Sequence, residues 1–132
     1  MIEAVLFDLD DTLLDNNMER FIGPYFRALS ARLAHLLPPD KLVHDLIAAT
    51  EEMIAQTGRQ ETNAEAFWRG FERRAGIPKA TLNPLTEEFY ANDFGALQSY
   101  TRRRPLARPL VEYVIRSGRK AVIATNPLFP RA

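Results

Sequence analysis

The chain has 132 residues, 46% of them hydrophobic, and its 17 basic and 17 acidic residues give a formal net charge of zero. This composition is that of an ordinary globular protein, and it provides no field that would hold nucleic acid or an anionic membrane. Cysteine is absent, which excludes disulfides and thiolate zinc sites and fits a reducing compartment. The N-terminus has neither the basic flank of a signal peptide nor the length of a membrane span. We therefore expect a cytoplasmic protein, and the composition is compatible with a small charged ligand.

An apolar run that ends in acids opens the chain and reads V-L-F-D-L-D-D-T-L-L. The continuous apolar character of Ala4–Leu9 predicts a strand that is buried on both faces and central in a sheet. Because side chains alternate along a strand, Asp8 and Asp10 would share a face. A turn beginning at Asp11 and Thr12 would bring backbone N–H groups toward the same volume. Such a volume suits a divalent cation together with a phosphate.

The next segment has helical periodicity. We expect Asn16 to be the N-cap of this helix, with Glu19 answering it three residues later. Gly23 and Pro24 are expected to interrupt the helix. From Tyr25 onward, leucines at helical spacing form one apolar face that ends at a pair of prolines.

Three more amphipathic segments follow. Residues 42–54 have one apolar stripe, and Thr62 with Glu65 forms a capping box for a third helix that ends before Gly76. A fourth helix is expected to open at Asn83, followed by a proline. Four amphipathic stripes on short connections hide one another best in a four-helix bundle.

The last segment returns to alternating helix and strand. Tyr100–Pro105 is interpreted as a linker, and a short helix after it ends near Gly118. A second buried strand, Ala121–Ala124, then runs into Thr125 and Asn126. A helix followed by a strand indicates α/β architecture, so residues 15–102 are expected to form a helical insertion in an α/β fold.

Two motifs carry a family resemblance: D-L-D-D-T-L-L-D near the N-terminus and V-I-A-T-N-P after the helical segments. In order and spacing they resemble motifs one and two of the haloacid dehalogenase superfamily. The resemblance implies an α/β fold with a Rossmann-like parallel sheet and an inserted α-helical cap. Residues 1–14 and 103–132 would form the core, and residues 15–102 the cap. It also implies a magnesium-dependent phosphohydrolase that acts on a small phosphomonoester through an aspartyl phosphate.

The resemblance assigns roles to individual residues. Asp8 resembles the nucleophile, because a metal-bound carboxylate attacks phosphorus without first losing a proton. Asp10 resembles the general acid and base that protonates the leaving oxygen and later activates water. Asp8 and the backbone carbonyl of Asp10 resemble the Mg²⁺ ligands. The residues expected to contact phosphate are Thr125, Asn126, Asp11 and Thr12. For the last two of these, turn-fixing bonds are the alternative.

The chain departs from the family pattern in one respect. In the family, a phosphate-binding lysine and an acidic pair that completes the magnesium site follow motif two, and neither is found after motif two in this sequence. Lys120 cannot supply the lysine, because it precedes the second strand and so lies at the opposite end of the sheet from Thr125. We therefore expect the chain to be the N-terminal part of a longer phosphatase. The alternative function is a catalytically inactive fragment or binding module of the same fold. Because the dehalogenase branch dispenses with a proton donor at this position, Asp10 favours phosphoryl transfer over dehalogenation.

The acidic residues and the arginines near the linker also allow other interpretations. A calcium loop of EF-hand type would use Asp8, Asp10, Thr12 and Glu19, but Leu13 stands where that loop needs glycine. Solvated turn acids are the plain alternative to a site. Arg102–Arg104 is interpreted as part of a solvated linker, with contact to substrate or to acidic core residues as the alternative.

Overall fold

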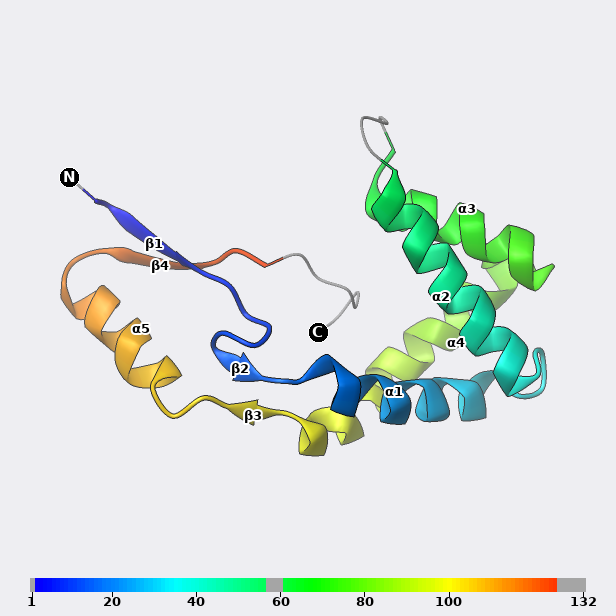
Figure 1. Ribbon diagram of the computed structural model, residues 1–132, viewed down its shortest axis with the longest axis horizontal. Coiled ribbons are helices and arrows are strands. Elements are labelled where there is room, and N and C mark those ends of the chain that lie inside the picture. The colour runs from blue at the N-terminus through cyan, green and yellow to red at the C-terminus, as the bar shows by residue number, and fades with distance from the viewer. Residues whose placement is uncertain (1, 57–60, 126–132) are drawn as a thin grey trace. The chain divides into compact units, whose positions relative to one another are not determined.

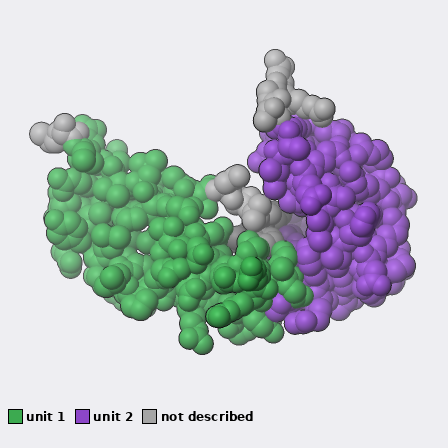
Figure 2. Space-filling view, viewed as in Figure 1, with its two compact units in different colours: residues 1–23, 96–132 green, residues 24–95 purple. Residues whose placement is uncertain are grey.

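The computed structural model describes residues 2–56 and 61–125. The chain divides into two compact units, one formed by residues 1–23 with 96–132 and the other by residues 24–95 (Figure 2). The secondary structure is mixed α/β and mostly helical, with a small parallel sheet in the first unit (Figure 1). The expected α/β class is thus confirmed at this coarse level.

The parallel sheet pairs the two ends of the chain. Strand β1 (Ala4–Phe7) pairs with β4 (Lys120–Ile123), and Ala4 faces Lys120 at one end while Phe7 faces Ile123 at the other. Helix α5 (Ala107–Arg116) directly precedes β4 and packs against it (Figure 1). Its end is marked by Gly118, whose φ of 76° only glycine adopts without strain. The predicted order of strand, helix and parallel strand is therefore present.

Two burial predictions are wrong for the described chain: that Ala4–Leu9 is buried on both faces, and that the strand at Ala121–Ala124 is buried. Phe7 and Val114 are buried, whereas Leu6 is 65% exposed and Val122 is 41% exposed. Leu6 and Phe7 point to opposite faces because side chains alternate along a strand. One helix covers one face of a two-stranded sheet, so the apolar run alone did not determine burial.

A second, two-stranded ribbon lies next to the acidic residues. Strand β2 (Leu14–Asp15) pairs antiparallel with β3 (Arg102–Arg103), so that Leu14 faces Arg103. A 3₁₀ helix, Phe94–Tyr100, precedes β3. Within Tyr100–Pro105, which the sequence predicts to be a linker, Arg102 and Arg103 thus form one strand of this ribbon.

In the described residues, the remaining elements are four helices. They are α1 (Met18–Leu33), α2 (Pro39–Ala55), α3 (Asn63–Ala75) and α4 (Lys79–Asn92), and α2 packs along α3 (Figure 1). In unit 24–95 the largest fully buried side chains are Phe71, Phe89, Leu33, Leu42 and Leu82. Each described helix is too short or too polar to cross a membrane.

Local signals set the ends of α3 as predicted. Thr62 accepts a hydrogen bond from the Glu65 backbone N–H, and the Glu65 carboxylate accepts one from the Thr62 N–H, which is the complete capping box. At the other end Gly76 has a φ of 70° and donates its N–H to the Glu72 carbonyl. The capping box and the glycine stop are both confirmed.

Two predicted helix boundaries at proline are wrong. Helix α1 continues through Pro24, because buried residues on both sides of the proline, among them Phe21 and Tyr25, lie on one continuous stripe. Helix α4 begins at Lys79 rather than at Asn83, and contains Pro84. Burial along each stripe outweighs the hydrogen bond that a proline removes, which costs about 3 kcal/mol.

Candidate functional site

The acid loop, defined here as residues 8–16, follows β1 at the carboxyl end of that strand. A single acceptor, the Leu9 carbonyl, receives hydrogen bonds from the backbone N–H groups of Thr12, Leu13 and Leu14, at 3.3, 3.1 and 3.0 Å. The chain therefore turns tightly directly after the strand. Asp11 has a φ of 58°, a left-handed conformation that aspartate adopts more readily than most residues.

Two hydrogen bonds hold the two acids that the sequence singled out. The Thr12 hydroxyl donates to Asp8 Oδ2 at 3.1 Å, and Asn16 Nδ2 donates to Asp10 Oδ1 at 2.6 Å. Asp8 is exposed and Asp10 is partly buried. Each carboxylate thus has a donor from the same loop, which restricts its orientation without covering it.

Asn16 is a site residue that the sequence analysis placed elsewhere. Its Oδ1 accepts the Asp11 backbone N–H at 2.9 Å, while its Nδ2 binds Asp10. The prediction that Asn16 caps the first helix is wrong, because Asn17 Oδ1 accepts the Arg20 N–H at 3.2 Å and takes that role. Two successive asparagines offered the same local signal, and only the fold of the loop separates their roles.

The other two loop residues of the predicted site make turn-fixing bonds. The Asp11 backbone N–H is bound by Asn16, and the Thr12 backbone N–H donates to Leu9. These bonds match the alternative that the sequence left open for both residues. They also give the loop a defined shape from its own groups.

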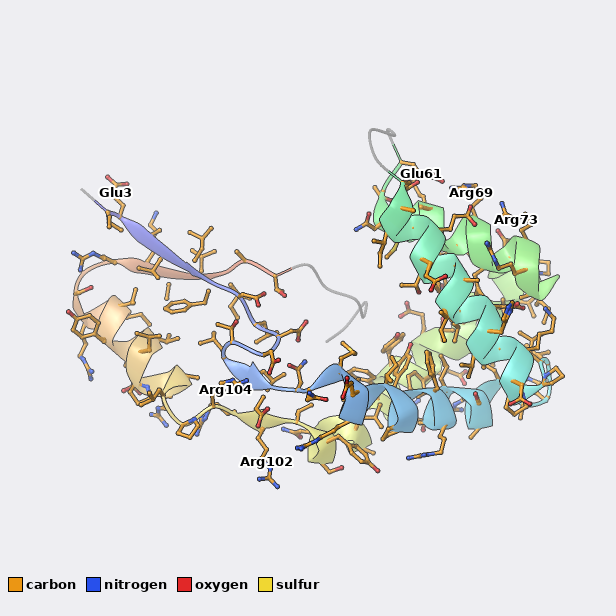
Figure 3. The ribbon with its side chains drawn as sticks, viewed as in Figure 1. Glu3, Glu61, Arg69, Arg73, Arg102 and Arg104 are labelled. Atoms are coloured by element: carbon orange, nitrogen blue, oxygen red, sulfur yellow. The ribbon has the colours of Figure 1, made fainter. Side chains whose placement is uncertain are left out.

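Arg104 adds a cation to the loop. Its Nη2 lies 2.6 Å from Asp11 Oδ1 and 4.0 Å from Asp15 Oδ1, and its backbone N–H donates to the Leu13 carbonyl at 3.1 Å. Figure 3 shows Arg104 beside β2 and Arg102 extending away from the ribbon. For Arg104 the alternative of a contact with acidic core residues is correct.

The register of the sheet places Thr125 at the same edge as Asp8. The Ala124 N–H donates to the Phe7 carbonyl at 2.8 Å, so the residues that follow both strands leave the sheet together. Thr125 is partly buried. Lys120 pairs with Ala4 at the opposite end, as predicted. Asn126, the other predicted phosphate donor, lies outside the described residues.

The donor chemistry of the loop fits a magnesium ion. Carboxylate and carbonyl oxygens are its preferred protein ligands, and Mg²⁺ commonly uses one or two carboxylates together with waters and phosphate oxygens. The Asp8 carboxylate and the Asp10 backbone carbonyl belong to this class. No three histidine, aspartate or glutamate side chains form a metal-binding group in residues 2–56 and 61–125. A magnesium ion held by the Asp8 carboxylate and the Asp10 carbonyl would take waters and phosphate oxygens as its other ligands.

Comparison with known proteins leaves the family open. No protein-family model matches the chain, and no curated protein matches it. The resemblance to the haloacid dehalogenase superfamily is therefore a hypothesis that the two sequence motifs alone carry.

Proposed function

We propose that the chain is a magnesium-dependent phosphohydrolase of the haloacid dehalogenase type, acting on a small phosphomonoester through an aspartyl phosphate. One observation supports this most directly. Asp8 and Asp10 follow β1 at the carboxyl edge of a parallel pair of strands, and Thr125 follows β4 at the same edge. Ligands of parallel α/β sheets bind at this edge.

In the proposed reaction Asp8 attacks phosphorus. A bond forms between its carboxylate oxygen and phosphorus, and the bond from phosphorus to the ester oxygen breaks. The Thr12 hydroxyl orients the Asp8 carboxylate through its hydrogen bond. A Mg²⁺ ion held by the Asp8 carboxylate and the Asp10 carbonyl would offset the negative charge of the phosphate. Thr125 would donate its hydroxyl to a phosphate oxygen.

Asp10 handles the proton in both steps. It gives its proton to the departing ester oxygen, since an alkoxide is too basic to leave unprotonated, and then takes a proton from the water that hydrolyses the aspartyl phosphate. Asn16 donates to one oxygen of Asp10, which leaves the other oxygen for this transfer. Under this proposal residues 15–102 act as a helical cap that selects the substrate and limits access of water.

The hydrolysis test compares matched aspartate substitutions. The purified chain is incubated with Mg²⁺ and p-nitrophenyl phosphate, and Asp8→Asn is expected to reduce the rate to the buffer background. Asp40→Asn, on the exposed first turn of α2, is the control and should match the parent. Negligible and equal rates in the parent and Asp8→Asn would refute the enzyme and favour a binding module.

A second substrate separates the roles of the two acids. Asp10→Asn should lower kcat by about 10²- to 10⁴-fold. The loss should be larger for an alkyl phosphate than for p-nitrophenyl phosphate, because nitrophenolate leaves without a proton. An equal loss on both esters would contradict the assignment of Asp10 as the general acid.

Binding of a phosphate mimic tests whether Asp8 is the nucleophile, and it does so without requiring turnover. Fluoroberyllate with Mg²⁺ should give bound fluorine signals in ¹⁹F NMR for the parent and for Asp40→Asn. Asp8→Asn removes the anionic oxygen that beryllium would bond, so these signals should be absent. Equal signals in Asp8→Asn would show that Asp8 is not the acceptor.

A further inference from the structure

Arg104 is joined to the acid loop by both its backbone and its side chain. The backbone N–H donates to the Leu13 carbonyl at 3.1 Å, directly after the β2–β3 ribbon. The guanidinium reaches Asp11 Oδ1 at 2.6 Å, with Asp15 Oδ1 at 4.0 Å. Strand β3 follows the helices in the chain. Arg104, directly after β3, therefore connects this strand with the loop that carries Asp8.

The partner of Arg104 is the residue that needs support. Asp11 occupies the left-handed region with a φ of 58°, which persists in a side-chain-bearing residue only when neighbouring groups hold it. Asn16 binds the Asp11 N–H at 2.9 Å and Arg104 binds its carboxylate. Asn16 also binds Asp10, so a shift of Asp11 would be transmitted to the proposed general acid.

Charge reinforces this contact. The acid loop holds the carboxylates of Asp8, Asp10, Asp11 and Asp15. These groups repel one another, and an incoming phosphate adds to that repulsion. Among the described residues, Arg104 is the cation that contacts these carboxylates. It pairs with Asp11 and Asp15, which the proposed mechanism does not use as reacting groups. Pairing these leaves Asp8 and Asp10 free for the reaction.

We propose that Arg104 is a positioning residue that holds the turn at Asp11 and thereby the placement of Asp8 and Asp10; as a catalytic role this rests on the proposed phosphohydrolase. Arg104 contacts Asp11 through one nitrogen, and its Nε is buried without a hydrogen-bond partner among the described residues. A contact through a single nitrogen is one that lysine can partly replace, unlike a two-nitrogen fork.

The kinetic test uses Arg104→Gln, Arg104→Lys and Arg102→Gln with p-nitrophenyl phosphate and Mg²⁺. Arg102 is exposed, lies in the same ribbon and extends away from it (Figure 3), so it controls for loss of charge. Arg104→Gln should lower kcat by about 10- to 100-fold with little change in KM, because misplaced reacting groups slow the chemical step. Arg104→Lys should stay within about threefold of the parent, and Arg102→Gln should equal the parent.

A double substitution tests the specific partner. Asp11→Asn should lower kcat by a factor similar to that of Arg104→Gln, and the combined variant should be no slower than either alone, as expected for one shared contact. Additive losses would overturn the pairing. An unchanged kcat in Arg104→Gln, or an equal loss in Arg102→Gln, would overturn the positioning role.

Amide hydrogen exchange separates this inference from the proposed function. Exchange of the Thr12, Leu13 and Leu14 amides should be about tenfold faster in Arg104→Gln and unchanged in Arg102→Gln, because these amides bond to Leu9 within the held turn. If the parent hydrolyses no ester, the proposed function and the catalytic role both fail. Unchanged amide exchange in Arg104→Gln would in addition overturn the inference that Arg104 holds the turn at Asp11.

Discussion

Phe89→Ala should be the most damaging single truncation among the aromatic residues of α4. The Phe89 side chain is 0% exposed. Its ring contacts three other rings edge-on: Tyr25 at 5.8 Å and 73°, Tyr90 at 5.3 Å and 72°, and Phe94 at 6.2 Å and 76° between centroids and planes. Truncation therefore removes both buried area and three oriented aromatic contacts.

The expected loss follows from these contacts. Replacing a buried phenylalanine with alanine costs about 3–5 kcal/mol of unfolding free energy. Each edge-on aromatic pair contributes about 0.5–1.5 kcal/mol beyond its area, which places Phe89→Ala in the upper part of this range, at about 4–5 kcal/mol. Since domains unfold with about 5–15 kcal/mol, this single change should remove much of the stability of residues 24–95.

Urea denaturation followed by tryptophan fluorescence measures this loss. Trp68 is the only tryptophan in the chain and lies in α3, so its signal reports the same unit. The control is Ile54→Ala, at a side chain 65% exposed in α2, with an expected change within about 0.5 kcal/mol. If Phe89→Ala does not fold, Phe89→Leu should still lose about 1–2 kcal/mol. A Phe89→Ala loss no larger than that of Ile54→Ala would refute the packing argument.

Three further predictions concern the helices. Thr62→Ala should cost about 1 kcal/mol of unfolding free energy, with Thr62→Ser as the conservative control, and urea midpoints check it. Gly76→Ala should cost about 1–2 kcal/mol because its φ is 70°, whereas Gly95→Ala, at an open position without positive φ, should be neutral in the same assay. Hydrogen bonds from Arg74 and Arg73 hold the pKa of Glu52 at about 2, below its ordinary 4.5. Its folded pKa is depressed, so its contribution to stability is full above pH 4.5 and is lost as the pH falls toward 2; urea titrations from pH 6 to 2 should show this loss in the parent and not in Glu52→Gln.

The features that were predicted correctly are those that a few neighbouring residues determine. The capping box of Thr62 and Glu65 needs only residues three apart, and the stop at Gly76 needs only a left-handed residue after the helix. The acids after β1 were found for the same reason, since a strand followed by a turn is a local pattern. The prediction that Thr125 lies at the edge of Asp8 needed one further rule, that both strands run parallel.

The features that were missed depend on residues far apart in the chain. Arg104 and Asp11 are 93 positions apart, and a two-residue strand such as β3 is too short to give a periodic signal. The prolines in α1 and α4 misled the prediction for a related reason. The local rules that a proline interrupts a helix, as expected at Pro24, or marks its first turn, as expected at Pro84, were outweighed by burial of residues such as Leu82, which precedes Pro84.

The two kinds of feature meet at the acid loop. Its sequence places carboxylates at the end of a strand, but the conformation of Asp11 is unfavourable by itself and needs outside support. Asn16 supplies part of that support from within the loop, and Arg104 supplies the rest from the returning strand. Helices α1 to α4 lie between Asn16 and Arg104 in the sequence. The loop therefore has its full set of contacts only when the residue that follows these helices packs back against it. The positions of Asp8 and Asp10 therefore depend on Arg104, the residue directly after β3.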